Sequence, residues 1–328
     1  MKIVYDPSHR RHQPRTEILY GKPTPHPDRP ERVEAIVSAL AATPWAERIV
    51  APHVYSLDLA ARVHEPAYVE HLVKREIETG QADPGEEWFP YTWPAHRSLD
   101  TGTPLLGVTR EVAWASACVA LTAADFVLGG EPSAYALCRP PGHHAARGAM
   151  GGYCYFNNAA LTADHLLRAS PSGARVAILD LDIHHGNGTQ DIFYESDRVL
   201  YCSIHLVAED GYPPHSGFAD EVGQGSGAGW TFNQPLRLGT GWDVYAAALE
   251  RALERIAQAA PRHLVLSQGF DTFEGDRWGG FLLRAEHFAR TGERLRALGL
   301  PVVAVLEGGY EPANLAAGSL ALLEGLGV

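Results

Sequence analysis

The chain has 328 residues, 45% of them hydrophobic, and a formal net charge of −12 at pH 7. This length suits one large α/β domain or two ordinary ones, and the acidic balance argues against a nucleic-acid partner but is compatible with a small cationic one. The four cysteines lack CxxC spacing, which argues against a disulfide framework and favours reduced, buried thiols in the cytoplasm. No membrane association is expected, because we find no apolar run of spanning length and no signal-peptide core at the amino terminus.

Strands and helices alternate along the chain. Short apolar runs predict strands, and apolar residues at helical spacing predict helices between them. Asp28 and Glu31 resemble a capping box at the start of the first helix. This alternation, without a linker or repeat, predicts one domain over residues 1–328 with a mostly parallel central sheet and helices on both faces. The expected strands are 2–5, 133–138, 176–180, 199–204, 263–267 and 301–306, and the expected helices are 31–40, 66–78, 109–128, 157–169, 190–194, 242–259, one before residue 301 and one from 312.

Two long irregular loops interrupt this pattern, at 80–104 and 206–233. The first combines Glu86 and Glu87 with the aromatic residues of 88–94, so it can either contact a cationic chain or form an apolar patch at a subunit interface. A third irregular segment, 7–30, contains His9, His12 and His26, which we expect to be surface or loop histidines.

The most informative stretch is residues 176–188, Val-Ala-Ile-Leu-Asp-Leu-Asp-Ile-His-His-Gly-Asn-Gly. An apolar strand runs directly into Asp180, Asp182 and His184, which point the same way for as long as the extended conformation lasts. Because unpaired buried carboxylates cost several kcal/mol, a bound cation is the simplest compensation. The stretch therefore predicts a metal site.

Other chemically active residues also follow predicted strands. They are His143 and His144, Asp271 and Tyr310. In a parallel sheet the carboxyl ends of the strands meet at one edge, where α/β proteins usually bind ligands. We therefore expect these residues to converge with Asp182 and His184 on one rim.

The motifs PPGHHA, DLDIHHGNGTQ, GFDTFEGD and EGGY, spread over most of residues 1–320, resemble those of the zinc-dependent histone deacetylase superfamily. The segment 151–160, the DTFEGD motif and the loop around 90–94 look most like those of bacterial acetylpolyamine amidohydrolases. The resemblance implies the arginase/deacetylase fold and a cytoplasmic amidohydrolase that removes acetyl groups from N-acetylated polyamines such as acetylputrescine or acetylcadaverine.

The resemblance also implies roles for individual residues. Asp182, His184 and Asp271 would bind one catalytic Zn²⁺ per chain, although Mn²⁺ or Fe²⁺ would also suit two carboxylates and one imidazole. His144 would be the general base, with His143 as its electrostatic partner, oriented by Asp180. In some relatives an Asp stands at the position of Asn187, and the neutral Asn would leave His144 less basic. Tyr310 would donate its hydroxyl to the developing oxyanion.

Further residues are assigned by the same resemblance. Gly152, Tyr153 and Tyr212 would line the narrow acyl channel, although Tyr212 can also be read as a core aromatic. Structural K⁺ would occupy a first site formed by Asp180, Ser203 and the backbone carbonyls of Asp182, His184 and Ile204, and a second near Phe193, Ser196 and Val199.

The loop at 80–104 is short beside the dimerisation insert of typical polyamine deacetylases. This leaves open both a homodimer through that loop and the identity of the acids that hold the distal ammonium, for which Glu86, Glu87 and Asp100 are the candidates.

The alternatives for the activity are a protein acetyl-lysine deacetylase, an arginase-like binuclear hydrolase and a catalytically silent sensor. The binuclear site is disfavoured by Phe273, which stands where a second Asp ligand is needed.

Overall fold

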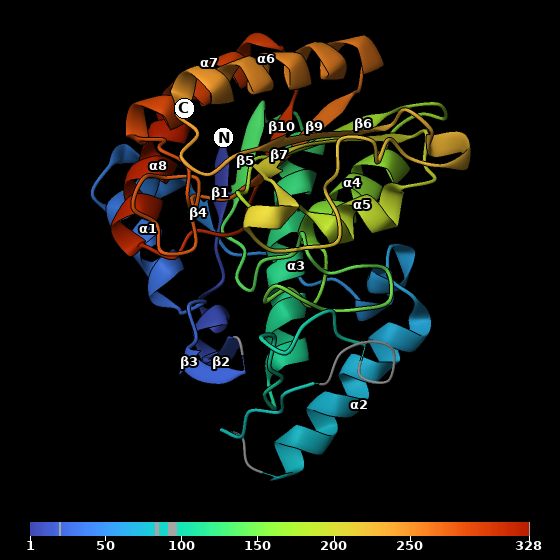
Figure 1. Cartoon of the computed structure of the whole chain (residues 1–328), viewed down its shortest axis with the longest axis vertical. Coiled ribbons are helices and arrows are strands. Elements are labelled where there is room, and N and C mark those ends of the chain that lie inside the picture. The colour runs from blue at the N-terminus through green and yellow to red at the C-terminus, as the bar shows by residue number, and fades with distance from the viewer. Residues whose placement is uncertain (20, 83–84, 91–96, 328) are drawn as a thin grey trace.

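The computed structural model describes residues 1–19, 21–82, 85–90 and 97–327 (Figure 1). Its centre is an eight-stranded sheet in the order β4-β1-β5-β10-β9-β6-β7-β8, in which every pairing of described strands is parallel. This confirms the predicted fold class. The strands are β1 (Lys2–Val4), β4 (Ile49–Val50), β5 (Ser133–Ala136), β6 (Val176–Asp180), β7 (Val199–Leu206), β8 (Thr231–Leu236), β9 (His263–Gln268) and β10 (Val302–Leu306).

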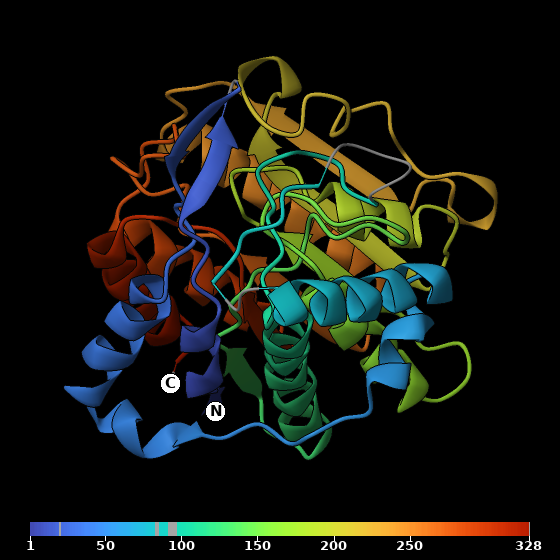
Figure 2. The same ribbon diagram turned by 90° about the horizontal axis from the view of Figure 1, so that it is seen from below.

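Helices cover both faces of the sheet (Figure 1). One face carries α1 (Glu31–Ala41), α6 (Trp242–Ala259), α7 (Ala285–Ala297) and α8 (Pro312–Gly325), and the other carries α3 (Thr109–Leu128), α4 (Asn158–Arg168) and α5 (Asn187–Phe193). The helix α2 (Pro66–Ala82) packs outside α3, away from the sheet, as the view from below shows (Figure 2).

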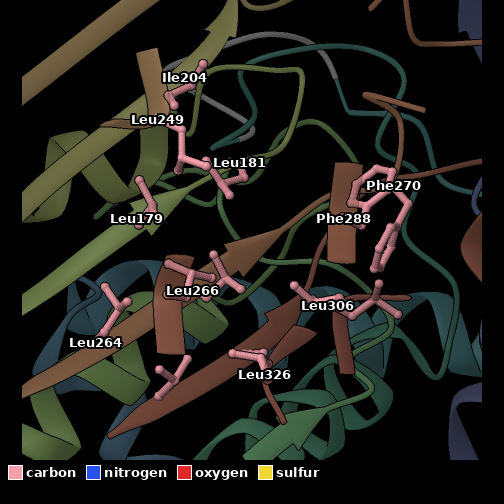
Figure 3. Close-up of a cluster of buried hydrophobic side chains, with 14 of the residues drawn as sticks. Leu179, Leu181, Ile204, Leu249, Leu264, Leu266, Phe270, Phe288, Leu306 and Leu326 are labelled. Carbon is pink, nitrogen blue, oxygen red and sulfur yellow. The ribbon is translucent and has the colours of Figure 1, made fainter. Parts of the chain in front are cut away.

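Side chains that alternate along the strands fill two cores. Leu264 and Leu266 of β9 join Leu179 and the helix residue Leu249 on one face (Figure 3), whereas Val265 packs on the other. Burial on both faces explains why the strands appear in the sequence as continuous apolar runs.

The helix α3 differs from one expectation. By length and composition Thr109–Leu128 could cross a membrane, contrary to the prediction that no apolar run reaches that length. However, 72% of its most apolar window is buried inside the protein, so it is a core helix, and it is the one such candidate among the described residues. The free, buried state of Cys118, Cys138, Cys154 and Cys202 agrees with prediction.

The amino-terminal segment is more ordered than predicted. It contains a hairpin of β2 (Thr16–Leu19) and β3 (Lys22–Pro25), and His9, His12 and His26 are buried rather than exposed. The predicted capping box is also wrong, because the carboxylate of Asp28 pairs with the buried Arg32 and Arg139 and gives α1 no side-chain cap.

The second predicted loop is also shorter than expected, because residues 231–236 form β8 at the sheet edge. The expected aromatic loop falls partly outside the described residues, at 83–84 and 91–96. The helix α2 continues to Ala82, beyond its predicted end at residue 78.

Candidate active site

Four adjacent strands in the middle of the sheet, β5, β10, β9 and β6, end at the same edge. The segments that follow them carry the chemically active residues identified in the sequence. These segments are 139–145 after β5, 307–310 after β10, 269–271 after β9 and 181–187 after β6. The convergence expected from the motif positions is therefore present.

Asp182, His184 and Asp271 form a cluster of potential metal ligands, with one donor atom of each within 4.8 Å of the others. The Nδ1 atom of His184 lies 3.0 Å from Oδ1 of Asp182 and 3.3 Å from Oδ2 of Asp271. Burial and the neighbouring Asp182 carboxylate raise the pKa of Asp271 to about 7. A bound cation would remove this repulsion between buried carboxylates.

The surroundings of the cluster fit a metal ion. Apart from the 3.3 Å contact with His184, Oδ2 of Asp271 is buried without a hydrogen-bond partner among the described residues, so it has an open coordination position. Gly308 lies so close that a Cβ atom there would be 2.2 Å from this oxygen and 2.6 Å from Oδ2 of Asp182. Two carboxylates and one imidazole suit Zn²⁺ and harder divalent ions alike.

Asp180 is separate from this cluster. The strand β6 ends at Asp180, and the chain then turns, so that Asp182 and His184 leave the strand alternation that the sequence suggested. Oδ2 of Asp180 lies 3.1 Å from Nδ1 of His143, and it also accepts a hydrogen bond from Tyr201. Asp180 therefore orients His143.

The two histidines have opposite electrostatic environments. Burial disfavours the charged form of His143, but Asp182 and Asp180 outweigh it and raise the pKa of His143 to about 10. Burial, followed by the neighbouring His143 and His184, lowers the pKa of His144 well below its usual value. A hydrogen bond of 2.7 Å joins Nδ1 of His144 to Oδ1 of Asn187, which requires a proton on Nδ1. Nε2 of His144 is then free to accept a proton.

Tyr310 lines the same pocket as His144. Its backbone N–H donates to Oδ2 of Asp276 at 2.7 Å, and the guanidinium of Arg32 lies 4.8 Å from the centre of its ring. Arg32 also donates to the backbone carbonyls of Glu307 and Gly309. Burial raises the pKa of Tyr310 well above its usual value, so the hydroxyl keeps its proton and can serve as a donor.

A pocket of about 180 Å³ leads to His144, His184 and Tyr310. Tyr153 and Tyr212 line it, and the ring of Tyr153 packs edge-on against Tyr310. Gly152 adopts a φ of +54°, and a Cβ atom there would lie 2.1 Å from the His144 ring. This glycine therefore allows the backbone to approach the general-base candidate closely.

The three candidate acids lie in different places. Asp100 lines the pocket, but its Oδ2 accepts hydrogen bonds from Tyr212 and from the backbone of Gly152, so it holds the pocket wall. Glu87 accepts hydrogen bonds from the backbone of Arg15 and Thr16. Glu86 is exposed, and neither Glu86 nor Glu87 lines the pocket.

An acid that sequence reasoning missed lines the pocket instead. Glu17 of β2 is only 6% exposed and accepts a hydrogen bond of 2.6 Å from the Tyr153 hydroxyl at Oε1. Its Oε2 is buried without a hydrogen-bond partner among the described residues. Burial raises the pKa of Glu17, and a cation at Oε2 would stabilise its charged form.

The residues expected to bind K⁺ lie in two different places along β6 and β7. Asp180 and Ser203 are register partners on β6 and β7, and Ser203 and Ile204 are buried on β7. At the second expected site, the N–H of Ser196 donates to the carbonyl of Phe193, and Val199 begins β7.

Comparisons with known proteins agree with this geometry. Residues 26–326 match the histone deacetylase domain family. The chain is 38% identical to acetylpolyamine amidohydrolase 1 of Pseudomonas aeruginosa, covering 99% of this chain and 98% of that protein. It is 35% identical to acetylpolyamine amidohydrolase of Mycoplana ramosa, covering 94% and 95%.

The crystal structure of acetylpolyamine aminohydrolase from Burkholderia pseudomallei superposes with a TM-score of 0.93 at 36% identity, covering 100% of this chain and 99% of that one. A match over most of the chain at this identity is decisive for the family. The chain belongs to the histone deacetylase family and is a deacetylase of that family.

Proposed function

We propose that the protein hydrolyses the amide bond of N-acetylated polyamines of the acetylputrescine and acetylcadaverine type, releasing acetate and the free amine. The observation that carries this proposal is the buried, unpaired Oε2 of Glu17 in a pocket that leads to His144, His184 and Tyr310. An ammonium group at the far end of a short alkyl chain is a suitable partner for such a carboxylate. The acetylpolyamine amidohydrolases among the relatives point to the same substrate class.

The proposed metal is Zn²⁺, held by Asp182, His184 and Asp271. When bound, it would polarise the acetamide carbonyl and lower the pKa of the attacking water. The proposal also includes structural K⁺ held by Asp180, Ser203 and the backbone carbonyls of Asp182, His184 and Ile204, and a second K⁺ near Phe193, Ser196 and Val199.

The residues around the metal cluster supply the remaining chemistry. His144 accepts a proton from water at Nε2 and later delivers it to the leaving amine. His143, oriented by Asp180, carries positive charge beside it. Tyr310 donates its hydroxyl to the oxyanion as the carbonyl carbon becomes tetrahedral, and the aromatic walls formed by Tyr153 and Tyr212 admit an unbranched chain.

A side-by-side comparison of acetylputrescine, acetylcadaverine and an acetyl-lysine peptide, with defined zinc loading, tests the substrate. We expect a kcat/KM on the small acetylated amines at least about tenfold above that on the peptide, because an ion pair with a buried carboxylate is worth roughly 1.5–3 kcal/mol. Equal or better turnover of the peptide would favour a protein acetyl-lysine deacetylase instead.

Metal stoichiometry tests the binuclear alternative. Among the described residues there is one cluster of potential metal ligands, and Phe273 is in the position where a second Asp would be needed. We expect one catalytic ion per chain by elemental analysis after dialysis. Two ions at the cluster would favour an arginase-like hydrolase.

The proposal extends to partners and location. The negative net charge and the absence of a basic run among the motifs support a soluble cytoplasmic enzyme with a small cationic substrate and no nucleic-acid partner. A homodimer through loop 80–104 belongs to the same proposal, and light scattering of the purified protein tests it.

A further inference from the structure

The motif that carries Tyr310 begins with a buried acid to which the proposed reaction assigns no role. Glu307 directly follows β10 and is completely buried. Its Oε1 accepts a hydrogen bond of 2.7 Å from the Ser267 hydroxyl on the neighbouring strand β9. Its Oε2 accepts hydrogen bonds from the backbone N–H groups of Gly142 at 2.7 Å and His143 at 3.1 Å.

These contacts join two segments that are far apart in sequence. Gly142 and His143 belong to the loop after β5 that presents His144, and they are 165 and 164 residues from Glu307. Two successive N–H groups directed at one carboxylate oxygen form a small anion-binding turn. The Glu307 carboxylate therefore occupies an anion-binding site that is formed by the backbone N–H groups of the loop carrying His144.

The backbone around Glu307 is held just as firmly. The carbonyl of Glu307 accepts a hydrogen bond of 2.5 Å from Arg32, and its N–H donates to the carbonyl of Gln268 at 2.8 Å. The next N–H, that of Gly308, donates to Oδ2 of Asp182 at 2.8 Å. The segment that leads to Tyr310 is thus fixed to β9 and to the metal cluster, while its first side chain reaches the histidine loop.

We propose that Glu307 is a positioning residue that sets the loop carrying His143 and His144 in register with the segment carrying Tyr310. It acts through the hydrogen bonds of Oε2 to Gly142 and His143 and touches neither substrate nor metal. The general base activates the water that attacks the carbonyl group, and the oxyanion donor binds the oxygen of that same group, so both must be placed correctly around it. A displacement of about 1 Å of a catalytic group costs roughly a factor of 10² in rate. This inference rests on the proposed function only for the turnover measurements.

Two conservative substitutions distinguish the effect of where the Glu307 side-chain oxygen lies from the effect of its negative charge. Glu307→Gln keeps an oxygen that reaches both N–H groups, and the Ser267 hydroxyl can rotate to accept from the new amide. Glu307→Asp keeps the negative charge, but its side chain is one methylene shorter and its oxygens withdraw from Gly142 and His143. The matched control is Ser267→Ala, which removes the hydrogen bond at Oε1 and leaves those at Oε2 in place.

The measurement is kcat and KM on acetylputrescine, with zinc content and unfolding temperature recorded for each variant. We expect Glu307→Asp to lower kcat by about tenfold or more with little change in KM, and Glu307→Gln and Ser267→Ala to stay within about threefold of the parent. A kcat that is lost in Glu307→Gln and kept in Glu307→Asp would overturn the proposal in favour of a purely electrostatic role. An equal loss of kcat in Ser267→Ala would overturn the proposal as well, because a general packing defect would then explain the loss in Glu307→Asp.

A second readout does not depend on turnover. Backbone amide resonances of Gly142 and His143, assigned by selective ¹⁵N labelling, should move upfield in Glu307→Asp and remain near their parent positions in Glu307→Gln. Unchanged amide shifts in Glu307→Asp would contradict the anchoring contact. If the parent protein hydrolyses no acetylated amine, the proposed function fails, while these shifts still decide the role of Glu307.

Discussion

The proposed role of Tyr310 as oxyanion donor depends on its hydroxyl group alone. The ring is held by its backbone contact to Asp276 and by Arg32, neither of which involves the hydroxyl. Replacing Tyr310 with Phe should therefore preserve the fold and the metal cluster. We expect kcat to fall by about 10² to 10³, the usual cost of losing one oxyanion donor, and steady-state kinetics with metal analysis measures it.

A matched control for this variant is Tyr55→Phe. The hydroxyl of Tyr55 donates to the carboxylate of Asp125 on α3, and Tyr55 does not line the pocket, so removal of its hydroxyl should leave kcat unchanged. Tyr310→Phe protein that turns over at the parent rate would show that the hydroxyl does not stabilise the oxyanion.

Glu17 should determine preference for a charged substrate. Glu17→Gln keeps the acceptor for the Tyr153 hydroxyl and removes the negative charge at Oε2. We expect kcat/KM on acetylputrescine to fall by about 10-fold to 100-fold, because a hydrogen bond between charged groups is worth roughly 1.5–3 kcal/mol. On N-butylacetamide, which has no ammonium group, the same variant should match the parent. An equal loss on both substrates would assign Glu17 to pocket structure.

Individual site residues could be predicted from the sequence where they follow apolar strands, and Glu17 could not because it does not. Asp182, His184, Asp271 and Tyr310 follow apolar strands, so their positions in a parallel sheet place them at one edge. Glu17 lies in a segment without clear periodicity, and its partner Tyr153 is 136 residues away. No local pattern reports such a contact, which forms only when the hairpin β2–β3 folds over the pocket.

At the scale of elements, burial decided which strands could be predicted. The central strands are apolar on both faces and were identified, and the helices α3 and α6 have the predicted bounds. The strand β8 at the edge contains Asn233, Gln234 and Pro235, and β4 has two residues, so neither carries the apolar run by which a strand is recognised. The cluster of Asp182, His184 and Asp271 could be located because it follows the central strands, whereas Glu17 of the hairpin β2–β3 could not.

In the loop after β5, the backbone at Gly152 lies very close to the His144 ring. Gly152 has a φ of +54°, and a Cβ atom there would lie 2.1 Å from Cδ2 of His144. Gly152→Ala should displace the imidazole and lower kcat by on the order of 10². Steady-state kinetics on acetylputrescine measures this loss.

Gly173→Ala provides the control for backbone strain. Gly173 has a φ of +84°, and a Cβ atom added there would have no neighbour within 4 Å, so this substitution introduces the unfavourable φ without a clash. Both variants should lose about 1 kcal/mol or more of unfolding free energy through the left-handed conformation, but only Gly152→Ala should lose activity. Parent-like kcat in Gly152→Ala would mean that the His144 ring tolerates the added methyl group.

At the scale of the whole molecule, buried histidines make stability depend on pH. Burial is the largest cause that lowers the pKa of these groups, to about 4 for His9, His26, His64 and His205 and to about 3 for His12. An unfolded chain binds protons at these histidines near pH 6.5, whereas the folded protein does not until pH falls much further. Their stabilising contribution is therefore complete above about pH 6.5 and is lost as pH falls from there toward 4.

His64 allows a direct test of this dependence, because it neither belongs to the metal cluster nor lines the pocket, and both nitrogens of its neutral ring are hydrogen-bonded. Nδ1 lies 2.9 Å from the carbonyl of Ala146, and Nε2 accepts from the N–H of Asn157 at 3.0 Å. The shift from 6.5 to about 4 corresponds to at most about 3 kcal/mol of unfolding free energy across this window. In urea unfolding between pH 7 and pH 4.5, His64→Gln should show a shallower decline than the parent, and the exposed His215→Gln should follow the parent. Parallel pH profiles for all three proteins would mean that His64 is protonated in the folded state as readily as in the unfolded one.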